Sequence, residues 1–192
     1  ESSSRADREE LYRWIEYYKI KFKSRVYTPL NNSEKYTLVL MGRADFGLLG
    51  SYNKYKQTPF ETFHVGGDGM TGSYTYATET IGLRGYDNGA LTPYSDGRAY
   101  TRFSMELHFP FLLQPSSTIY GLAFVEGGNA WTSLENFNPF SLKRSAGVGV
   151  RIFLPMIGLM GIDWAYGFDK VWNGSSYKKG GSQFHFILGQ EF

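Results

Sequence analysis

The sequence predicts an all-β chain that forms part of an antiparallel transmembrane β-barrel, and three observations lead to this prediction. Aromatic residues make up 18% of the 192 residues and there are 23 glycines, a composition typical of strands joined by tight turns. Several long segments alternate apolar and polar residues with the period of two at which strand side chains change faces. No stretch approaches the ~18–20 apolar residues of a membrane helix, whereas barrel strands leave the hydropathy near average.

The composition excludes several other classes of protein. The chain has no cysteine, which excludes a disulfide framework and a thiolate zinc site. Its net charge is only +2, so we expect no nucleic-acid partner, although the pI of 8.7 leaves a mild basic bias. Residues 1–10 are polar and contain no signal peptide, so the sequence is expected to be a mature chain or a fragment.

Two alternating segments open the chain, with a turn at 28–32 between them. The first, from Tyr12, carries aromatic and aliphatic residues on one face and a basic stripe on the other, formed by Lys19, Lys21, Lys23 and Arg25. We expect this stripe to face the barrel lumen, where it would attract water, acidic partners or lipid headgroups. The second segment places on its apolar face Tyr36, Leu38, Leu40, Ala44, Phe46 and Leu48, opposite Lys35, Thr37, Arg43 and Asp45.

Five further strands follow a long irregular stretch. They are expected at 100–109, 119–131, 142–154, 160–168 and 184–192, with turns at 110–117, 136–139, 154–158 and 173–176. The count is about seven strands of roughly 10–16 residues, longer than the ~5–6 of soluble strands and sufficient for the ~9–11 that cross a membrane. A soluble sandwich is the alternative, but charges on the second face would be costly in its core, whereas a polar barrel interior accepts them.

The stretch 57–97 shows no clean alternation and is rich in glycine, so it is predicted to be one large loop, a feature that is usually functional. Late in this loop, Gly82-Leu83-Arg84-Gly85-Tyr86 resembles the Arg-Gly-aromatic motif in the sixth extracellular loop of the BamA superfamily of barrel-assembly and two-partner-secretion proteins. Segments 104–107, 124–131 and 144–150 follow in the family's order and spacing. The end, 184–192, is similar to the family's last strand, with alternating aromatics that finish in a C-terminal Phe.

This resemblance implies an architecture. The family's barrel has sixteen strands, so residues 1–192 would form a single C-terminal barrel domain that supplies about the last seven. Within it, 57–97 would be a long extracellular loop that folds inward. Bacterial barrels normally have even strand numbers. Seven is odd, so we expect a fragment that does not close alone and has open, associating edges, rather than a loop that supplies another strand.

The resemblance also implies a function in the cell outer membrane. The protein would be an assembly factor that folds and inserts client β-barrel proteins through a lateral gate formed with its last strand. Its partners would be unfolded outer-membrane clients, outer-membrane lipid and accessory lipoproteins of an assembly complex. The alternatives are a two-partner-secretion translocator, which would share the loop motif, and the barrel domain of an outer-membrane lipase-type fusion, which would need a hydrolase domain. A passive porin would lack the motif.

Arg84 is the first candidate site residue. A guanidinium stays charged and offers a planar fork of donors, so an arginine that leaves bulk water inside a lumen needs carboxylates. Alternation places Glu106 and Glu126 on the polar faces of adjacent strands, and the resemblance implies that acidic wall residues at these positions meet the loop arginine. We expect a lumenal cluster that pins the loop; the alternative is a solvated arginine between ordinary turn glycines.

The last strand is the second candidate site. Its apolar row would face lipid, as in every barrel strand, and comprises Phe184, Phe186, Leu188 and Phe192. The resemblance implies in addition that this strand pairs weakly with the first strand of the whole barrel and forms the lateral gate, where client strands add by β-augmentation. Gly189 weakens strand packing and is expected to help this seam open.

No catalytic, cofactor-binding or metal site is expected. His64, His108 and His185 lie far apart without metal-ligand spacing, and the glycine-rich turn at 66–69 offers one aspartate, too few ligands for calcium. Asp163 and the other aspartates have no Ser-His-Asp order or paired-carboxylate context that would support acid–base chemistry. The protein is therefore predicted not to be an enzyme and to use no cofactor.

Overall fold

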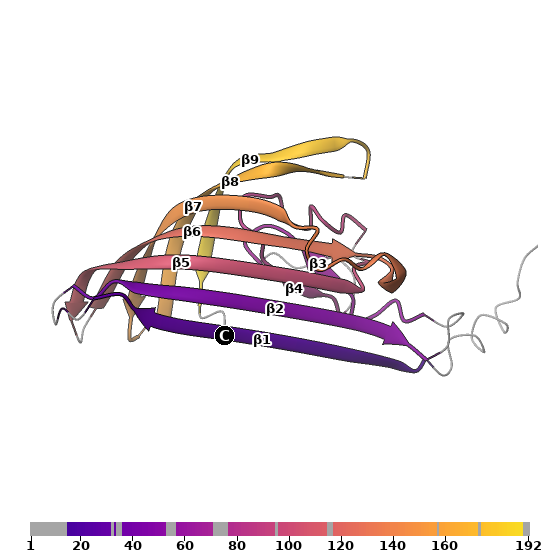
Figure 1. Cartoon of the computed structure of the whole chain (residues 1–192), viewed down its shortest axis with the longest axis horizontal. Helices are drawn as coiled ribbons and strands as arrows, with labels where there is room; N and C mark the ends of the chain where they lie inside the picture. The colour runs from indigo at the N-terminus through magenta and orange to yellow at the C-terminus, as the bar shows by residue number, and fades with distance from the viewer. Residues whose placement is uncertain are drawn as a thin grey trace, which may run out of the picture.

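A computed structural model describes residues 15–31, 33, 36–52, 57–70, 77–94, 96–114, 117–156, 158–172 and 174–189. Seven long strands form one antiparallel sheet in the order β1-β2-β5-β6-β7-β8-β9, and two short strands form a separate pair, β3-β4 (Figure 1). The elements are β1 Tyr17–Pro29, β2 Val39–Ser51, β3 Phe63–Val65, β4 Glu79–Ile81, β5 Ala99–Gln114, β6 Ser117–Trp131, the 3₁₀ helix η1 Leu134–Asn136, β7 Lys143–Leu154, β8 Gly158–Trp172 and β9 Tyr177–Leu188. In the described residues, no helix has both the length and the apolar character needed to cross a membrane.

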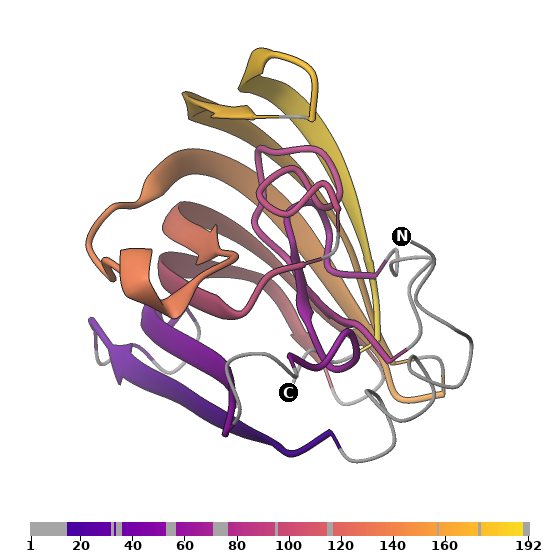
Figure 2. The ribbon, with the colours of Figure 1, turned by 90° about the vertical axis from the view of Figure 1, so that its right-hand side faces the viewer.

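The large sheet is strongly curved, and its concave side holds the 57–97 loop (Figure 2). Each strand pairs antiparallel with its neighbour, from Tyr17 opposite Ser51 in the first pair to Trp172 opposite Tyr177 in the last. β1 and β9 form the two edges, and in the described part of the chain they do not pair with each other. The predicted fold class, part of an all-β antiparallel barrel, is confirmed, with a sheet that is open in this chain.

The two faces of the sheet differ in the way that alternation predicts. Large apolar side chains are exposed on the convex face, among them Ile20, Phe22, Val26, Met105, Val125, Val148, Ile162, Phe184 and Phe186. Charged side chains are buried on the concave face beneath the loop, among them Asp45, Arg102, Glu106, Glu126, Arg151 and Asp163. A soluble sandwich would bury the apolar face, so this distribution is that of a membrane barrel wall.

β5 runs through a proline that predicted a turn. The expected turn at 110–117 is wrong in its first part, because β5 continues to Gln114 and β6 begins at Ser117. β2 pairs with β5 only as far as His108, so among the described residues Pro110 lies where that side of β5 has no partner strand. The N–H that proline lacks therefore has no partner strand on that side, and no hydrogen bond between strands is lost. The register against β6 shifts between Pro110 and Leu112, which marks a bulge next to the proline.

The 57–97 loop contains two strands that the sequence pattern did not predict. β3 and β4 have three residues each, too few to show a period, and they pair in parallel without joining the large sheet. An apolar core between this pair and the concave face is formed by Leu49, Phe63, Val65, Ile81 and Tyr100. The rings of Phe63 and Tyr100 meet edge to face with centroids 4.7 Å apart. The loop is therefore packed against the wall before any charged contact is considered.

Candidate functional site

The motif 82–86 is held by its backbone on two sides. Leu83 exchanges backbone hydrogen bonds of 3.0 and 3.2 Å with Gly67, which tie the motif to the segment after β3. The carbonyl of Gly82 accepts from Nη1 of Arg102, on β5, at 2.7 Å. Arg102 is itself oriented by Asp45 of β2, whose Oδ2 lies 2.7 Å from Nη2. The motif is thus attached to both the loop and the wall independently of the Arg84 side chain.

The Arg84 side chain meets three carboxylates from three strands. Its Nη2 donates to Glu106 of β5, its Nε lies 3.3 Å from Glu126 of β6, and its Nη1 lies 3.1 Å from Asp163 of β8. The backbone N–H of Arg84 also donates to Glu126, at 2.9 Å. The exposed fraction of the side chain is 11% for Arg84, 2% for Glu126 and 0% for Asp163. We call these four residues, together with Arg151, the Arg84 cluster.

Arg151 of β7 contributes a second cation to this cluster. Its Nη2 lies 2.7 Å from Asp163, so this carboxylate bridges two arginines. His108 of β5 lies 2.9 Å from Glu106 and gives that carboxylate a second partner. Burial alone lowers the pKa of Arg84, but the charges of the three carboxylates outweigh it and raise the pKa above its ordinary value. Arg84 therefore keeps its charge although it has left bulk water.

An aromatic ring lies beneath the guanidinium. Cζ of Arg84 is 3.6 Å from the ring centroid of Phe124, on β6. A cation over an aromatic face gains most when both groups are shielded from water, as they are here. Phe124 packs in turn with Leu122 and Ala165, so its ring is fixed by close packing and fixes the plane of the guanidinium.

Gly85 occupies a position that accepts only glycine. Its φ is +88°, and an added Cβ would lie 2.9 Å from both the backbone nitrogen of Gly167 and the Cβ of Ser145. Its N–H donates to Nε2 of His185, on β9, at 2.9 Å. The close approach that glycine permits therefore brings the loop motif into direct contact with the last strand.

Tyr86 completes the motif as a wall-packed residue. It is fully buried and packs with Leu83, Ala90 and Val171. Its hydroxyl donates to the carbonyl of Arg144 at 2.6 Å. Burial raises the pKa of Tyr86 to about 12, so the hydroxyl remains a donor at neutral pH.

A second charged cluster holds the loop against β1. Glu79 of β4 lies 3.0 Å from Nζ of Lys19, 3.1 Å from Nζ of Lys21 and 4.0 Å from Nζ of Lys23. Lys19 also contacts Glu61, at 2.9 Å. We call Glu79 and its three lysines the Glu79 cluster. The three lysines of the basic stripe, which was expected to meet lumen water, acidic partners or headgroups, thus have acidic partners in the chain's own loop.

The predicted gate residues lie at the end of the chain. Phe184, Phe186 and Leu188 of β9 are exposed on the convex face, and Phe192 lies outside the described residues. Gly189 follows the end of β9 with a φ of +85°, and its N–H donates to the carbonyl of Leu159 at 2.8 Å. β9 pairs with β8 on one side, and its other edge has no partner strand in the described ranges.

Sequence reasoning selected two of the three carboxylates around Arg84, and it missed Asp163. Alternation had placed Asp163 on a polar strand face, but nothing distinguished it from the other aspartates. A signal was present, because Asp163 is the only charged residue between the small residues Gly161, Ala165 and Gly167 on that face. Small neighbours leave room for a loop to approach. The contact of His185 with Gly85 had no comparable signal.

Comparison with known proteins agrees with this geometry. A family model described as the Omp85 superfamily domain matches residues 7–192. Among solved structures, the chain is similar to BamA from Haemophilus ducreyi lacking POTRA domains 1-3, with a TM-score of 0.61 and 20% sequence identity. That match covers 90% of this chain and 35% of the other, so this chain spans about a third of it. The resemblance inferred from the motifs is confirmed, and the chain belongs to the Omp85 superfamily, a family of outer-membrane proteins.

Proposed function

We propose that this chain is the C-terminal part of the barrel of an outer-membrane assembly factor, which folds and inserts client β-barrel proteins through a lateral gate formed with its last strand. One observation carries the proposal. The loop motif contacts β9 through Gly85 and His185, at 2.9 Å, while the opposite edge of β9 has no partner strand in the described ranges. The strand that would form the gate is thus connected to the loop on the concave face.

In this proposal, Arg84 pins the loop inside the barrel. Its three carboxylates belong to β5, β6 and β8, so one side chain connects three wall strands to the loop. Charge-assisted hydrogen bonds of this kind contribute about 1.5–3 kcal/mol each. The role is mechanical, because the cluster keeps the loop in place while the wall at β9 opens, and it involves no covalent step.

The edge of β9 that has no partner strand in the described ranges supports a templating role; at its end, the N–H of Leu188 donates to Sδ of Met70 at 3.2 Å. Unpaired backbone groups on an edge strand accept a further strand, and this is the basis of β-augmentation. Phe184, Phe186 and Leu188 lie beside that edge on the convex face, where the apolar row of an arriving client strand would continue them. Among the described residues, nothing lies within 4 Å of a Cβ added at Gly189, and glycine itself weakens strand packing at this end of β9.

The proposed partners follow from the edge of β9 and from the apolar convex face of the sheet. Unfolded outer-membrane client proteins would meet the edge of β9, and outer-membrane lipid would cover the convex face. Accessory lipoproteins of an assembly complex would bind elsewhere on the longer protein, since this chain spans only 35% of the matched structure. Localisation in the cell outer membrane, as an integral multi-strand protein, is part of the same proposal.

The proposal is tested by a disulfide lock in the complete barrel. Phe186→Cys is combined with one cysteine on the first barrel strand. This chain has no cysteine of its own, and any cysteine elsewhere in the complete barrel is first replaced by serine, so that a single defined bond can form. We expect the oxidised lock to abolish insertion of a client barrel into liposomes, because the seam cannot separate, and reduction to restore insertion.

A matched lock serves as the control. Phe186→Cys combined with Ile162→Cys joins two residues that are already directly opposite in β8 and β9 and need not separate. It should leave insertion unchanged in both redox states. Equal insertion by the oxidised gate lock and the unlocked protein would refute the gate. Loss of insertion with both locks would mean that the change at Phe186, which the two locks share, causes the loss. That result would also refute the gate.

A further inference from the structure

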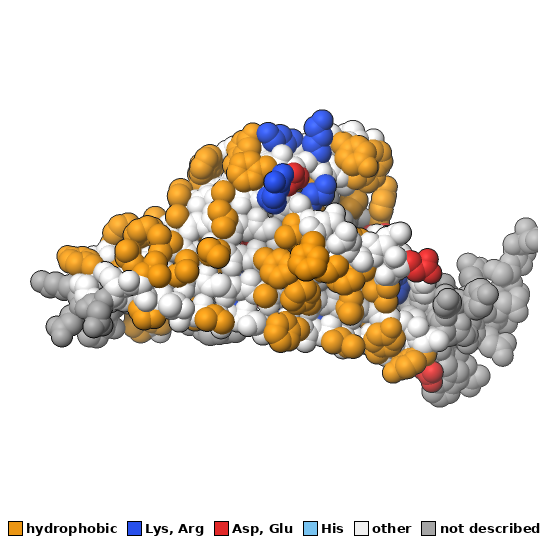
Figure 3. All heavy atoms as spheres, in the orientation of Figure 1, with side chains coloured by type: hydrophobic (Ala, Val, Ile, Leu, Met, Phe, Trp, Pro, Cys, Tyr) orange, Lys and Arg blue, Asp and Glu red, His pale blue; other side chains and the backbone are white. Residues whose placement is uncertain are grey.

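Three basic side chains gather on the convex face of β7, β8 and β9. They are Arg144, Lys170 and Lys179, all of which are exposed. Figure 3 shows basic groups over this part of the molecule with an acidic group among them. Val171 is buried against loop residues on the concave side, so its neighbour Lys170 points to the convex side. Lys179 is directly opposite Lys170 and shares its face.

The two lysines oppose each other without a carboxylate between them. Like charges directly opposite across two strands destabilise a sheet. Among the described residues neither lysine forms an ion pair; Lys179 donates instead to the hydroxyl of Tyr166 at 3.0 Å. The nearby Asp169 already binds Arg144, through guanidinium contacts of 3.0 and 3.1 Å and a backbone bond of 2.7 Å. The arrangement therefore leaves positive charge that an external anion would compensate.

The outward side chains of β8 change character along the strand. An aliphatic residue is followed by aromatic ones and then by a cation; in order they are Ile162, Trp164, Tyr166, Phe168 and, after a bulge, Lys170. Barrels carry aromatic girdles at headgroup level, between the apolar band and water. The basic side chains therefore lie where lipid headgroups would be.

The basic residues lie at the end of the sheet that has long connections. There, 52–98 joins β2 to β5, 132–142 joins β6 to β7 and the shorter 173–176 joins β8 to β9. At the other end, 30–38 joins β1 to β2, two residues join β5 to β6 and three join β7 to β8. In outer-membrane barrels the short turns are periplasmic and the longer loops are extracellular. The headgroups at this level would therefore belong to the outer leaflet.

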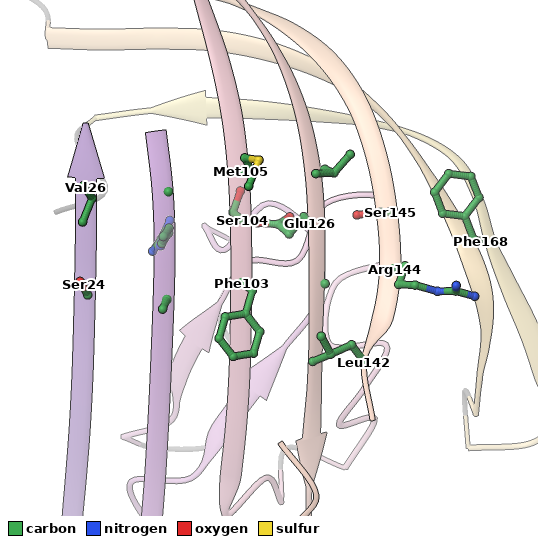
Figure 4. A pocket seen from close by; sticks show the side chains of 15 residues that line it. Ser24, Val26, Phe103, Ser104, Met105, Glu126, Leu142, Arg144, Ser145 and Phe168 are labelled. Carbon is green, nitrogen blue, oxygen red and sulfur yellow. The ribbon is translucent and has the colours of Figure 1, made fainter. Parts of the chain in front are cut away.

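An apolar depression begins beside the basic residues. It has a volume of about 960 Å³ on the convex face and has Arg144 and Phe168 at one side (Figure 4). Three small residues leave this space, because the cross-strand row that ends at Arg144 also contains Ser24, Ala44 and Gly127 beside Phe103. The depression offers space for acyl chains next to cations, a combination that fits an amphiphile better than a free anion.

We propose that Arg144, Lys170 and Lys179 bind the phosphate of a phosphorylated glycolipid of the outer leaflet, with its acyl chains along the depression. The lysines supply charge, and Asp169 holds Arg144 in position so that its remaining donors face outward. A basic residue near a charged lipid surface contributes about 1 kcal/mol, so loss of each lysine should raise the lipid Kd about fivefold. This proposal depends on the outer-membrane location proposed above but not on the gate.

The test measures lipid binding to the purified, folded protein in detergent. The probe is bisphosphorylated lipid A, and native mass spectrometry gives the fraction of protein that retains it. Lys170→Gln with Lys179→Gln should raise the Kd about 25-fold. Lys178→Gln is the matched control, because Lys178 adjoins Lys179 but turns inward to Asp87, at 2.9 Å. The control should bind like the wild type, and dephosphorylated lipid A should bind all variants weakly and equally.

Three outcomes would overturn the proposal. Equal retention by the double variant and the wild type would exclude the lysines, and equal binding of dephosphorylated lipid A would mean that the apolar face alone binds. Displacement of lipid A by millimolar inorganic phosphate would identify a free-anion site instead. Failure of the gate lock leaves this measurement unaffected because the assay contains no client, so the two proposals fail separately.

Discussion

The loop on the concave face is held by two charged clusters that differ in their surroundings. In the Arg84 cluster the exposed fraction is 11% for Arg84 and 0% for Asp163. In the Glu79 cluster it is 41% for Lys21, 35% for Lys23 and 23% for Glu79, while Lys19, at 13%, is shielded to about the same degree as Arg84. Removal of one partner from a buried pair leaves an unpaired charge, whereas exposed pairs contribute little. Ion pairs of similar length should therefore hold the motif 82–86 firmly, at the Arg84 cluster, and β4 weakly, at the Glu79 cluster.

The largest effect is expected from a substitution in the Arg84 cluster, the more buried of the two. Arg84→Gln would leave three carboxylates without their shared cation, and we expect a cost of about 3–5 kcal/mol to the docked loop. Hydrogen exchange of the 79–92 peptide should then lose more than a hundredfold of its protection. Lys21→Gln is the control. It also removes one positive charge that contacts the loop, but from an exposed ion pair with Glu79, and should change protection little. Unchanged protection in Arg84→Gln would show that the backbone and apolar contacts alone hold the loop.

A second prediction separates steric fit from charge at the same motif. Gly85→Ala requires a positive φ and places a Cβ 2.9 Å from the backbone of Gly167. We expect the docked loop to lose about 1–3 kcal/mol, since the wall must shift. Gly158→Ala is the matched control: it has a φ of +95°, and no other described residue lies within 4 Å of the added Cβ. Thermal unfolding should shift to a lower temperature more in Gly85→Ala than in Gly158→Ala; equal shifts would make backbone strain, and not close approach, the cause.

The buried cluster also shows how far sequence can predict this fold and site. Period-two alternation placed Glu106 and Glu126 on one face of adjacent strands, because the rule is local, and both carboxylates contact Arg84. Asp163 satisfied the same rule, but its approach to Arg84 depends on the curvature of the sheet, which brings β8 over the loop. Curvature arises from many strands together, so the small neighbours of Asp163 indicate room beside it but not which loop residue fills that room.

The remaining errors have the same non-local origin. A turn was expected at Pro110 because proline removes a donor, yet the structure tolerates it since pairing with β2 ends at His108. Where a neighbouring strand ends cannot be read from the strand that contains the proline. β3 and β4 were missed because three residues cannot show a period, and their position depends on the core around Phe63 and Tyr100.

The smallest effect is expected from a substitution in the Glu79 cluster, the more exposed of the two. Glu79→Gln should cost the docked loop 1 kcal/mol or less, because two of its three lysines, Lys21 and Lys23, are well exposed and long exposed side chains lose entropy when they pair. Burial alone would raise the pKa of Glu79, but hydrogen bonds from Lys19 and Lys21 and their charges lower it below its ordinary value. The contribution is therefore present above that ordinary value and is lost as the pH falls through the lowered pKa.

Salt distinguishes the two clusters in a single measurement. Exposed charges are screened over about 10 Å at 0.1 M ionic strength and over about 3 Å at 1 M, whereas buried pairs are screened much less. Hydrogen exchange at β4 should therefore differ between wild type and Glu79→Gln at low salt and become equal at 1 M. The loss of protection caused by Arg84→Gln should persist at both salt concentrations. If 1 M salt removed the effect of Arg84→Gln as well, water would reach that cluster, and burial would not explain why one side of the loop is held more firmly.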